Sequence, residues 1–335
     1  MRCDDLYVAG TGSYLPPEVP TRAAVEAGRW PADRLVTDRV AAIRVAGDEA
    51  AIEMAAAAAI GAVAHSGRDP ADFALVLHAS VYHQGLDLWA PASYVQREAV
   101  GGSCPAFEVR QMSNGGMAAL ELAASYLAAD PRRQAALLSA GDKFCPPAFD
   151  RWTAENGMVF GDGAAAIVLA RGGGLARLLS VATVGDGELE RMHRGDEPFT
   201  DTPLAGGVPF AADARVRQYL RRVGLAQVIG RILDGQRAAV DRALADAGVG
   251  LADIDLFVLP HFGFGRLTAG FLRPFGIDPD ATNWAWSRHI GHLGAADQFA
   301  GLDHLLRAGA PATDRLLLVL GIGSGFTWSA AVLRT

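Results

Sequence analysis

Ser113 is the residue whose position best suits covalent chemistry. It stands at a tight turn, followed by Asn114 and two glycines, between a short strand-like stretch from Ala106 and a nearly all-apolar run at 117–129. A hydroxyl at the start of a buried helix lies near free backbone N–H groups and the positive end of the helix dipole. Those groups can hold a nucleophile and the oxyanion that it creates. On this stretch alone the simpler interpretation is that Ser113 caps the helix, because serine is a preferred capping residue.

Two histidines and one acid in the second half of the chain could serve such a nucleophile. His261 follows an apolar strand-like stretch, His292 lies in a glycine-bounded loop, and Asp297 falls in the first turn of the helix that follows. Five positions along a continuous helix would point two side chains about 140° apart. Because His292 lies in the loop, a pair between His292 and Asp297 is feasible. The alternative is structural: hydrogen-bonded histidines, and an acid favoured by the helix dipole.

Ser113, His292 and Asp297 could act together as nucleophile, base and orienting group. A serine hydroxyl is a weak nucleophile that needs an adjacent base, and the base needs a partner that orients it. The order Ser, His, Asp along the chain differs from the familiar hydrolase orders. The turn reads Gln-Met-Ser-Asn-Gly over 111–115, without the GxSxG pattern. The residues therefore do not indicate an ordinary α/β-hydrolase.

The elements around these residues alternate between apolar strands and helices, which is typical of an α/β sheet with covered faces. Strands are expected within 6–17, 73–80, 106–112, 134–141, 157–170, 254–261 and 316–333, and helices over 49–65, 117–129, 228–247 and 294–307. Residues 187–215 are mostly polar and predict a long irregular loop. The segment 316–333 resembles 157–170, so the second half looks like a loose copy of the first. Two such halves would place a site at their junction.

Composition excludes several classes of protein. The chain has 335 residues, 50% of them hydrophobic, and a formal net charge of −7, which leaves no overall basic footprint for nucleic acid. The longest apolar run, 54–63, is too short to span a membrane. Three cysteines without metal spacing or a CxxC pair fit a reducing cytoplasm and no bound metal. The pair Gly10-Thr-Gly12 lacks the third glycine of a dinucleotide site.

Four motifs give the chain a resemblance to the β-ketoacyl-acyl-carrier-protein synthase III family, which has the thiolase fold. The stretch FEVRQMSNG at 107–115 looks like the family's nucleophile motif, with Ser113 in place of the acylated cysteine. The FGDGA turn at 160–164, the Pro-His pair at 260–261 and GSGFTW at 323–328 match three further family motifs. The resemblance runs over nearly the whole chain.

The resemblance implies an α/β thiolase-like fold, with two pseudo-duplicated halves in five layers (αβαβα) and a homodimer. The first half, 1–172, would carry Ser113, and the second, 173–335, would carry His261, His292 and Asp297 as the other catalytic residues.

The resemblance also implies how a substrate would bind. The backbone N–H groups of Ser113 and Gly325 would form the oxyanion hole. No cofactor is implied, because the substrate would be the phosphopantetheine thioester of coenzyme A or acyl carrier protein. Arg231 and Arg266 fall where the family places basic residues that meet the carrier protein, although both could be ordinary solvated arginines.

Departures from the family pattern narrow the range of functions that the resemblance implies. His292 replaces the family's catalytic asparagine. The stretch 33–38, which reads DRLVTD, has no tryptophan to stack on coenzyme A, so binding of coenzyme A in the family's usual way is not expected. A serine nucleophile with a downstream His-x4-Asp is similar to a subgroup that includes starter-unit and acyltransferase enzymes of anthracycline-type aromatic polyketide assembly. His193 matches a histidine in that subgroup's mid-chain loop and is expected to bind substrate.

Three hypotheses remain open at this point. In the first, Ser113 takes an acyl group from a thioester and passes it to a carrier-protein thiol, a hydroxyl or an amine. In the second, the acyl-enzyme condenses with malonyl-carrier protein with loss of carbon dioxide and primes a polyketide; His261 and a neutral His292 would be the required donors. In the third, the chain is an inactive partner subunit of another ketosynthase, but the retained histidines, acid and glycine turn argue against it.

Overall fold

The computed structural model describes residues 1–210, 212–307 and 313–335. Within them, the main sheet has nine strands in the spatial order β5-β4-β6-β7-β1-β8-β11-β10-β9. Their bounds are β1 (Tyr7–Tyr14), β4 (Phe73–Ala79), β5 (Ala106–Val109), β6 (Ala135–Asp142), β7 (Gly163–Ala170), β8 (Ala176–Gly185), β9 (Leu256–Val258), β10 (Leu316–Gly323) and β11 (Thr327–Arg334). A separate two-stranded ribbon pairs β2 (Glu18–Pro20) with β3 (Ala42–Arg44).

The strand order repeats along the chain. In the first group, β4 runs parallel to β6, and β6-β7-β1 are antiparallel neighbours. In the second, β9 runs parallel to β10, and β10-β11-β8 are antiparallel neighbours. The counterpart of β5 is reduced to one parallel bridge between Phe257 and Thr282. The groups join through the short β1–β8 pairing, Tyr7 with Arg177 and Val8 with Ala176. This repeat supports a division of the chain near residues 172 and 173, which stays a prediction.

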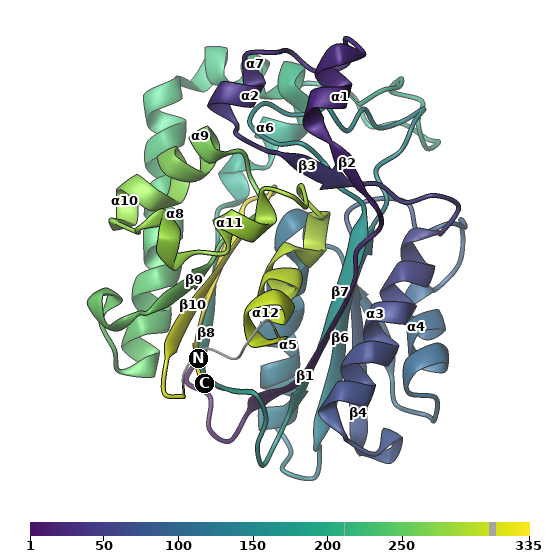
Figure 1. The fold of residues 1–335 in the computed structure, drawn as a ribbon, viewed down its shortest axis with the longest axis vertical. Coiled ribbons are helices and arrows are strands. Elements are labelled where there is room, and N and C mark those ends of the chain that lie inside the picture. Colours follow the sequence, from purple (N-terminus) through teal and green to yellow (C-terminus); the bar gives the residue numbers. More distant parts are fainter. Residues whose placement is uncertain (211, 308–312) are drawn as a thin grey trace.

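Five layers result, as predicted (Figure 1). Helices α3 (Ala51–Ser66) and α4 (Pro91–Ala99) cover the outer face of the first strand group, and α8 (Leu225–Ala247) covers the outer face of the second. Between the groups lie α5 (Gly115–Ala128) and α12 (Asp297–Arg307), which contact strands of both. The nearly all-apolar sequence of α5 suits this central layer, because a helix buried on most sides needs no polar face.

Glycine and alanine allow the two central helices to approach closely. A Cβ at Gly116 of α5 would lie 2.6 Å from the Ala295 carbonyl oxygen, just before α12. At Gly115 a Cβ would lie 3.1 Å from the Cβ of Ala79. This contact brings the start of α5 against the start of α12, and both starts carry candidate catalytic residues.

The remaining helices surround one end of the sheet (Figure 1). They are α1 (Thr21–Glu26), α2 (Arg34–Thr37), α6 (Arg191–Arg194), α7 (Ala212–Val223), α9 (Phe264–Leu267), α10 (Arg273–Phe275) and α11 (Trp284–Ser287). The prediction of an irregular loop throughout 187–215 was wrong, since α6 and the start of α7 fall within it. The charged, arginine-rich composition of α7 hid its helical character, because only Tyr219 of that helix is buried. No helix among the described residues is both long enough and apolar enough to cross a membrane.

Candidate active site

The turn that carries Ser113 is strained and aims the hydroxyl out of the helix. It forms a 3-10 segment, Met112–Asn114, and Met112 has the left-handed φ of 47°. Such a conformation in a non-glycine residue is uncommon and often marks a functional turn. Asn114 is the N-cap of α5, and the Ser113 Oγ instead lies 2.8 Å from the His292 Nε2. The interpretation of Ser113 as a helix cap was therefore wrong.

Asn114 fastens this turn to the second half of the chain. Its buried Nδ2 donates to the Oγ1 of Thr327 at 3.0 Å and to the Oγ of Ser329 at 2.8 Å, both on β11. A Cβ at Gly321 of β10 would lie 2.4 Å from the Asn114 Oδ1. Sequence reasoning missed this role for Asn114. The signal that could have revealed it was Gly321, because a glycine inside an apolar strand often marks a close backbone approach.

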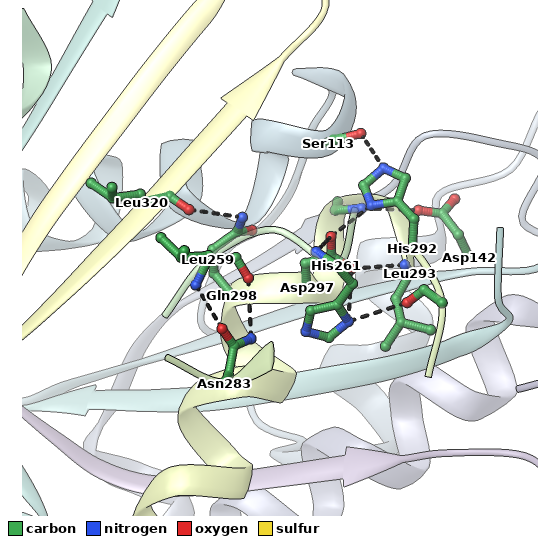
Figure 2. Close-up of polar contacts among 12 residues, drawn as sticks. Ser113, Asp142, Leu259, His261, Asn283, His292, Leu293, Asp297, Gln298 and Leu320 are labelled. Carbon is green, nitrogen blue, oxygen red and sulfur yellow. Dashed lines mark hydrogen bonds and ion pairs between the residues drawn. The ribbon is translucent and has the colours of Figure 1, made fainter. Parts of the chain in front are cut away.

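His292 is held by a carboxylate and by its own loop. Its Nδ1 lies 2.6 Å from the Asp297 Oδ2, and its backbone N–H donates to the Val159 carbonyl at 2.8 Å. The imidazole packs edge-on against Phe160 and Phe262, with ring centroids 5.3 and 5.4 Å away. The ring is therefore fixed with Nε2 toward the serine, as Figure 2 shows.

The loop geometry explains how residues five apart can meet. Gly291 and Gly294 both adopt left-handed φ values, 81° and 63°. The chain then makes a 3-10 turn, Gly294–Ala296, and α12 begins at Asp297. Because His292 lies outside the helix, its ring can turn back onto the carboxylate.

Asp297 is an ionised acceptor at the centre of the site. It is fully buried, and it accepts backbone N–H hydrogen bonds from Leu293 at 2.7 Å and His261 at 2.8 Å in addition to the His292 contact. Burial by itself raises the pKa of Asp297, but the two imidazoles and these hydrogen bonds bring that pKa below its ordinary value. A carboxylate on Nδ1 favours the tautomer in which Nε2 is free to accept the serine proton.

His261 lies on the opposite side of Asp297 from Ser113 and His292 (Figure 2). Its Nδ1 is 3.2 Å from the Gly291 carbonyl oxygen and 3.3 Å from the Asp297 Oδ1. Burial lowers the pKa of His261 below its ordinary value, so the neutral imidazole is favoured. These contacts suit a role for His261 in supporting Asp297.

Ser113 opens onto a cavity of about 180 Å³. The wall is mostly apolar, and its largest side chains are the rings of Phe149, Phe160, Phe210, Phe262 and Phe326. A few polar side chains interrupt it: Glu155, His193, Arg215, Arg266 and Ser324. An apolar cavity with a few convergent polar groups is the usual form of a small-molecule site.

His193 and Arg266 meet in this wall through Glu155, which sequence reasoning did not single out. The Arg266 Nη1 lies 2.6 Å from the Glu155 Oε1, and the His193 Nε2 lies 3.8 Å from the same oxygen. Burial raises the pKa of Glu155, but Arg266 and His193 outweigh it and hold that pKa far below its usual range. No sequence signal distinguished Glu155 from an ordinary surface acid.

The chain matches two family models and is similar to a solved acyltransferase structure. The model described as 3-oxoacyl-[acyl-carrier-protein (ACP)] synthase III matches residues 107–187, and the model of its C-terminal part matches residues 244–335. The solved structure of ChlB3, an acyltransferase, is 38% identical, covers 99% of this chain and 98% of its own, and superposes with a TM-score of 0.94. The chain belongs to the 3-oxoacyl-[acyl-carrier-protein] synthase III family.

Other members of the family are more distant. The β-ketoacyl-[acyl-carrier-protein] synthase III of Caulobacter vibrioides is 28% identical over 330 residues, with 98% of each chain covered. Synthase III 1 of Vibrio cholerae is 26% identical over 332 residues, again with 98% of each chain covered. The priming β-ketosynthase from the R1128 polyketide pathway is 22% identical, with 99% of this chain and 97% of its own covered and a TM-score of 0.78, and shows the shared fold.

Two further residues that the synthase III resemblance singles out are Gly325, which lies beside the cavity, and Arg231, which lies away from it. Gly325 has a φ of 138°, in the turn between β10 and β11, and its neighbours Ser324 and Phe326 line the cavity. Its backbone N–H as an oxyanion donor stays a prediction. Arg231 lies on α8, where its guanidinium forms a two-point pair with Asp186 at 2.8 and 2.6 Å, and it does not line the cavity.

Carrier-protein docking by Arg231 and Arg266 also stays a prediction. Their geometry differs, since Arg266 faces a buried carboxylate in the cavity wall and Arg231 pairs with Asp186 at a partly exposed position. Among the described residues, no group of three or more His, Cys, Asp and Glu side chains is arranged to hold a metal ion.

A second buried acid, Asp142, supports the His292 loop. Its carboxylate accepts backbone N–H groups of Val81 and Tyr82 at 2.8 to 3.0 Å, and a Cβ at Gly294 would lie 2.4 Å from its Oδ2. Burial raises the pKa of Asp142 to about 7, although these backbone groups lower it. Figure 2 shows it beside His292. Asp142 was not predicted, because it ends an apolar strand like many structural acids.

Proposed function

We propose that this synthase III-family protein is an acyltransferase that carries its acyl group on Ser113. The observation that supports this most directly is the continuous contact from the Ser113 Oγ through His292 to Asp297, at 2.8 and 2.6 Å. Nucleophile, base and orienting acid then stand in the order that activated serines require.

The first half-reaction forms the acyl-enzyme. A thioester enters the cavity with its carbonyl beside Ser113, and His292 takes the hydroxyl proton as the oxygen attacks. The backbone N–H groups of Ser113 and Gly325 hold the oxyanion, and the tetrahedral intermediate collapses with loss of the thiolate. Asp297 stabilises the imidazolium that forms, because it is buried, ionised and hydrogen-bonded to Nδ1.

The second half-reaction transfers the acyl group to an acceptor. The acceptor gives up its proton to a base in the site as it attacks the Ser113 ester, and His292 returns its own proton to the serine oxygen. The product is a new ester, thioester or amide, and the enzyme is regenerated. The donor is the phosphopantetheine thioester of an acyl carrier protein or of coenzyme A, and the names of the curated relatives refer to the first of these two carriers.

Decarboxylative condensation is the second candidate. It needs two neutral donors on the malonyl thioester oxygen, and the proposed pair was His261 and His292. His261 is 2% exposed, and its Nδ1 faces the Gly291 carbonyl and the Asp297 carboxylate, whereas acyl transfer needs only His292 beside Ser113. That position favours acyl transfer over condensation.

The inactive-subunit hypothesis is less favoured for a related reason. A chain without catalysis has no need to keep three side chains from two distant segments within hydrogen-bond distance. Here Ser113, His292 and Asp297 are so held, with a strained turn at Met112. Consistent site geometry supports an active enzyme.

A role in polyketide or related antibiotic biosynthesis is part of the proposal. It rests on the likeness of the Ser113, His292 and Asp297 pattern to the subgroup of anthracycline-type polyketide assembly. The likeness to ChlB3, described as an acyltransferase, supports the acyl-transfer part of the proposal. A cytoplasmic enzyme would suit this role.

The test is the intact mass of the protein after incubation with a panel of acyl-coenzyme A and acyl-carrier-protein thioesters. We expect a mass increase of one acyl group in the wild type and none in Ser113→Ala. Ser125→Ala, which removes an exposed hydroxyl from the same helix, is the matched control and should still be acylated. If no thioester labels the wild type, acyl transfer through Ser113 is wrong. Release of carbon dioxide from malonyl-carrier protein in step with turnover would favour condensation.

A further inference from the structure

The cavity wall holds a second imidazole–carboxylate pair that the first half-reaction does not use. His193 comes from α6, Glu155 from the segment after β6, and Arg266 from α9, so three separate parts of the chain converge. The Glu155 side chain is 12% exposed, the His193 side chain 18% exposed, and both border the same cavity as Ser113.

The arrangement keeps Glu155 charged and His193 available. Arg266 contacts the Glu155 Oε1 at 2.6 Å, and its guanidinium lies over the Phe262 ring at 4.7 Å. An arginine this close keeps a buried carboxylate ionised. Within the described residues, neither ring nitrogen of His193 has a hydrogen-bond partner, although both are buried. The His193 Nε2 lies 3.8 Å from the Glu155 Oε1, so the ring faces the carboxylate across the cavity wall.

A second base would be used in the step that transfers the acyl group to a hydroxyl acceptor, because of where the protons lie after acylation. During acylation, His292 takes the Ser113 proton, and the thiol of the donor can leave as a thiolate because a thiol is much more acidic than an alcohol. His292 then still carries the proton that the serine oxygen must regain. A thiol acceptor can attack as a thiolate and simply retrace the first half-reaction. A hydroxyl acceptor holds its proton tightly, so while His292 remains protonated a second base in the cavity is needed to remove it.

We propose that His193, positioned by Glu155 and Arg266, takes the proton of a hydroxyl acceptor during transfer from Ser113. This inference rests on the proposed acyl-serine mechanism. The acceptor oxygen attacks the ester carbonyl, the bond from that carbonyl to the Ser113 Oγ breaks, His193 receives the acceptor proton, and His292 gives its proton to the serine oxygen. The excess proton on His193 then passes to solvent, which replaces the one that the departing thiolate takes up. His193 is the catalytic residue in this step, and Glu155 and Arg266 are positioning residues.

The test separates the two half-reactions. Acyl-Ser113 enzyme is prepared with a thioester that labels the wild type, freed from excess donor, and mixed with glycerol as a hydroxyl probe or pantetheine as a thiol probe. Loss of the acyl mass gives the transfer rate to each probe. His193→Gln should slow transfer to glycerol by about 100-fold or more, the range of general base catalysis, and transfer to pantetheine by less than about 10-fold.

Glu155→Gln should show the same preference for the thiol probe, with a smaller loss toward glycerol, because it removes the charge beside His193 and leaves the imidazole in place. Glu98→Gln, at a surface pair with Arg97, is the matched control. Added imidazole should restore part of the glycerol rate in His193→Ala, which a merely structural role for His193 would not allow.

Each outcome decides between the proposals. If the variants slow both probes equally, or neither, the inference is overturned while acyl transfer through Ser113 stands. If the wild type transfers to pantetheine but not to glycerol or to any other hydroxyl tried, the hydroxyl acceptor is wrong. If no thioester labels Ser113 in the wild type, the proposed function fails and takes this inference with it.

Discussion

Ser113 and His292 are 179 positions apart in the chain, yet the Ser113 Oγ lies 2.8 Å from the His292 Nε2. The serine lies in the turn before α5 and the histidine precedes α12, and these two helices form the central layer between the strand groups (Figure 1). The contact therefore depends on how closely the starts of the two helices approach.

Gly116→Ala should loosen that approach. The new Cβ would lie 2.6 Å from the Ala295 carbonyl oxygen, so the backbone must shift. Overpacking of this kind costs about 1–3 kcal/mol of unfolding free energy, and the acylation rate should fall as well. Urea titration and intact-mass kinetics measure the two effects.

Gly61→Ala is the control for that substitution. Gly61 also lies in a helix, α3, but its nearest neighbour would be 3.9 Å from a new Cβ. Alanine there should stabilise the protein by about 0.5–1 kcal/mol, since glycine weakens helix interiors. Equal effects of the two substitutions would show that the close approach at Gly116 is unimportant.

Asp297→Asn should remove most of the acylation activity without unfolding the protein. An amide cannot stabilise the imidazolium, and it favours the wrong imidazole tautomer for a base at Nε2. A loss of about 10³–10⁴-fold in the acylation rate is expected. Stopped incubation with a thioester, followed by intact mass, measures it.

Asp303→Asn serves as the comparison for Asp297. Asp303 is also buried on α12, where its Oδ2 accepts from the Ser13 hydroxyl at 2.5 Å, and it makes no contact with His292. Its acylation rate should stay near that of the wild type. If Asp297→Asn is no slower than Asp303→Asn, Asp297 does not orient the base.

Asp142 should make stability depend on pH. Its pKa is raised from 3.8 to about 7, so between these values the folded state binds a proton that the unfolded state has lost. Stability is therefore fully present below about pH 4 and falls as the pH rises toward 7, by a few kcal/mol at most. In Asp142→Asn this dependence disappears, so the wild type's advantage should be largest near pH 5 and shrink toward pH 8. Urea unfolding of both proteins across that range measures the difference, and parallel curves would contradict the raised pKa.

The exposed edge of the sheet supports a homodimer. β5 is the outermost strand, and the Phe107 side chain on it is 56% exposed. Leu86 and Leu88, in the loop after the neighbouring strand β4, are also exposed. An open apolar edge invites pairing with another strand. Light scattering should give a dimer for the wild type and a monomer for Phe107→Asp, whereas a monomeric wild type would refute the proposal.

The sequence alone was sufficient to predict the α/β class and the resemblance to the synthase III family, and that resemblance implied the five layers. Those predictions depended on local patterns, such as apolar strands, the apolar run of α5 and four short motifs, which are written in neighbouring residues. The pairing of His292 with Asp297 was also foreseeable, because a glycine loop between them allows it. The helices within 187–215 were missed, since their charged composition hides a small buried face.

Only the tertiary structure decided the rest of the site. Whether Ser113 caps its helix or faces a base depends on the packing of α5 against the start of α12, and no local pattern encodes that distance. The position of His261 behind Asp297, and the meeting of Glu155 with His193 and Arg266, likewise require segments far apart in the chain to converge. Residue types set which chemistry was available, and long-range packing set which of those residues share a cavity.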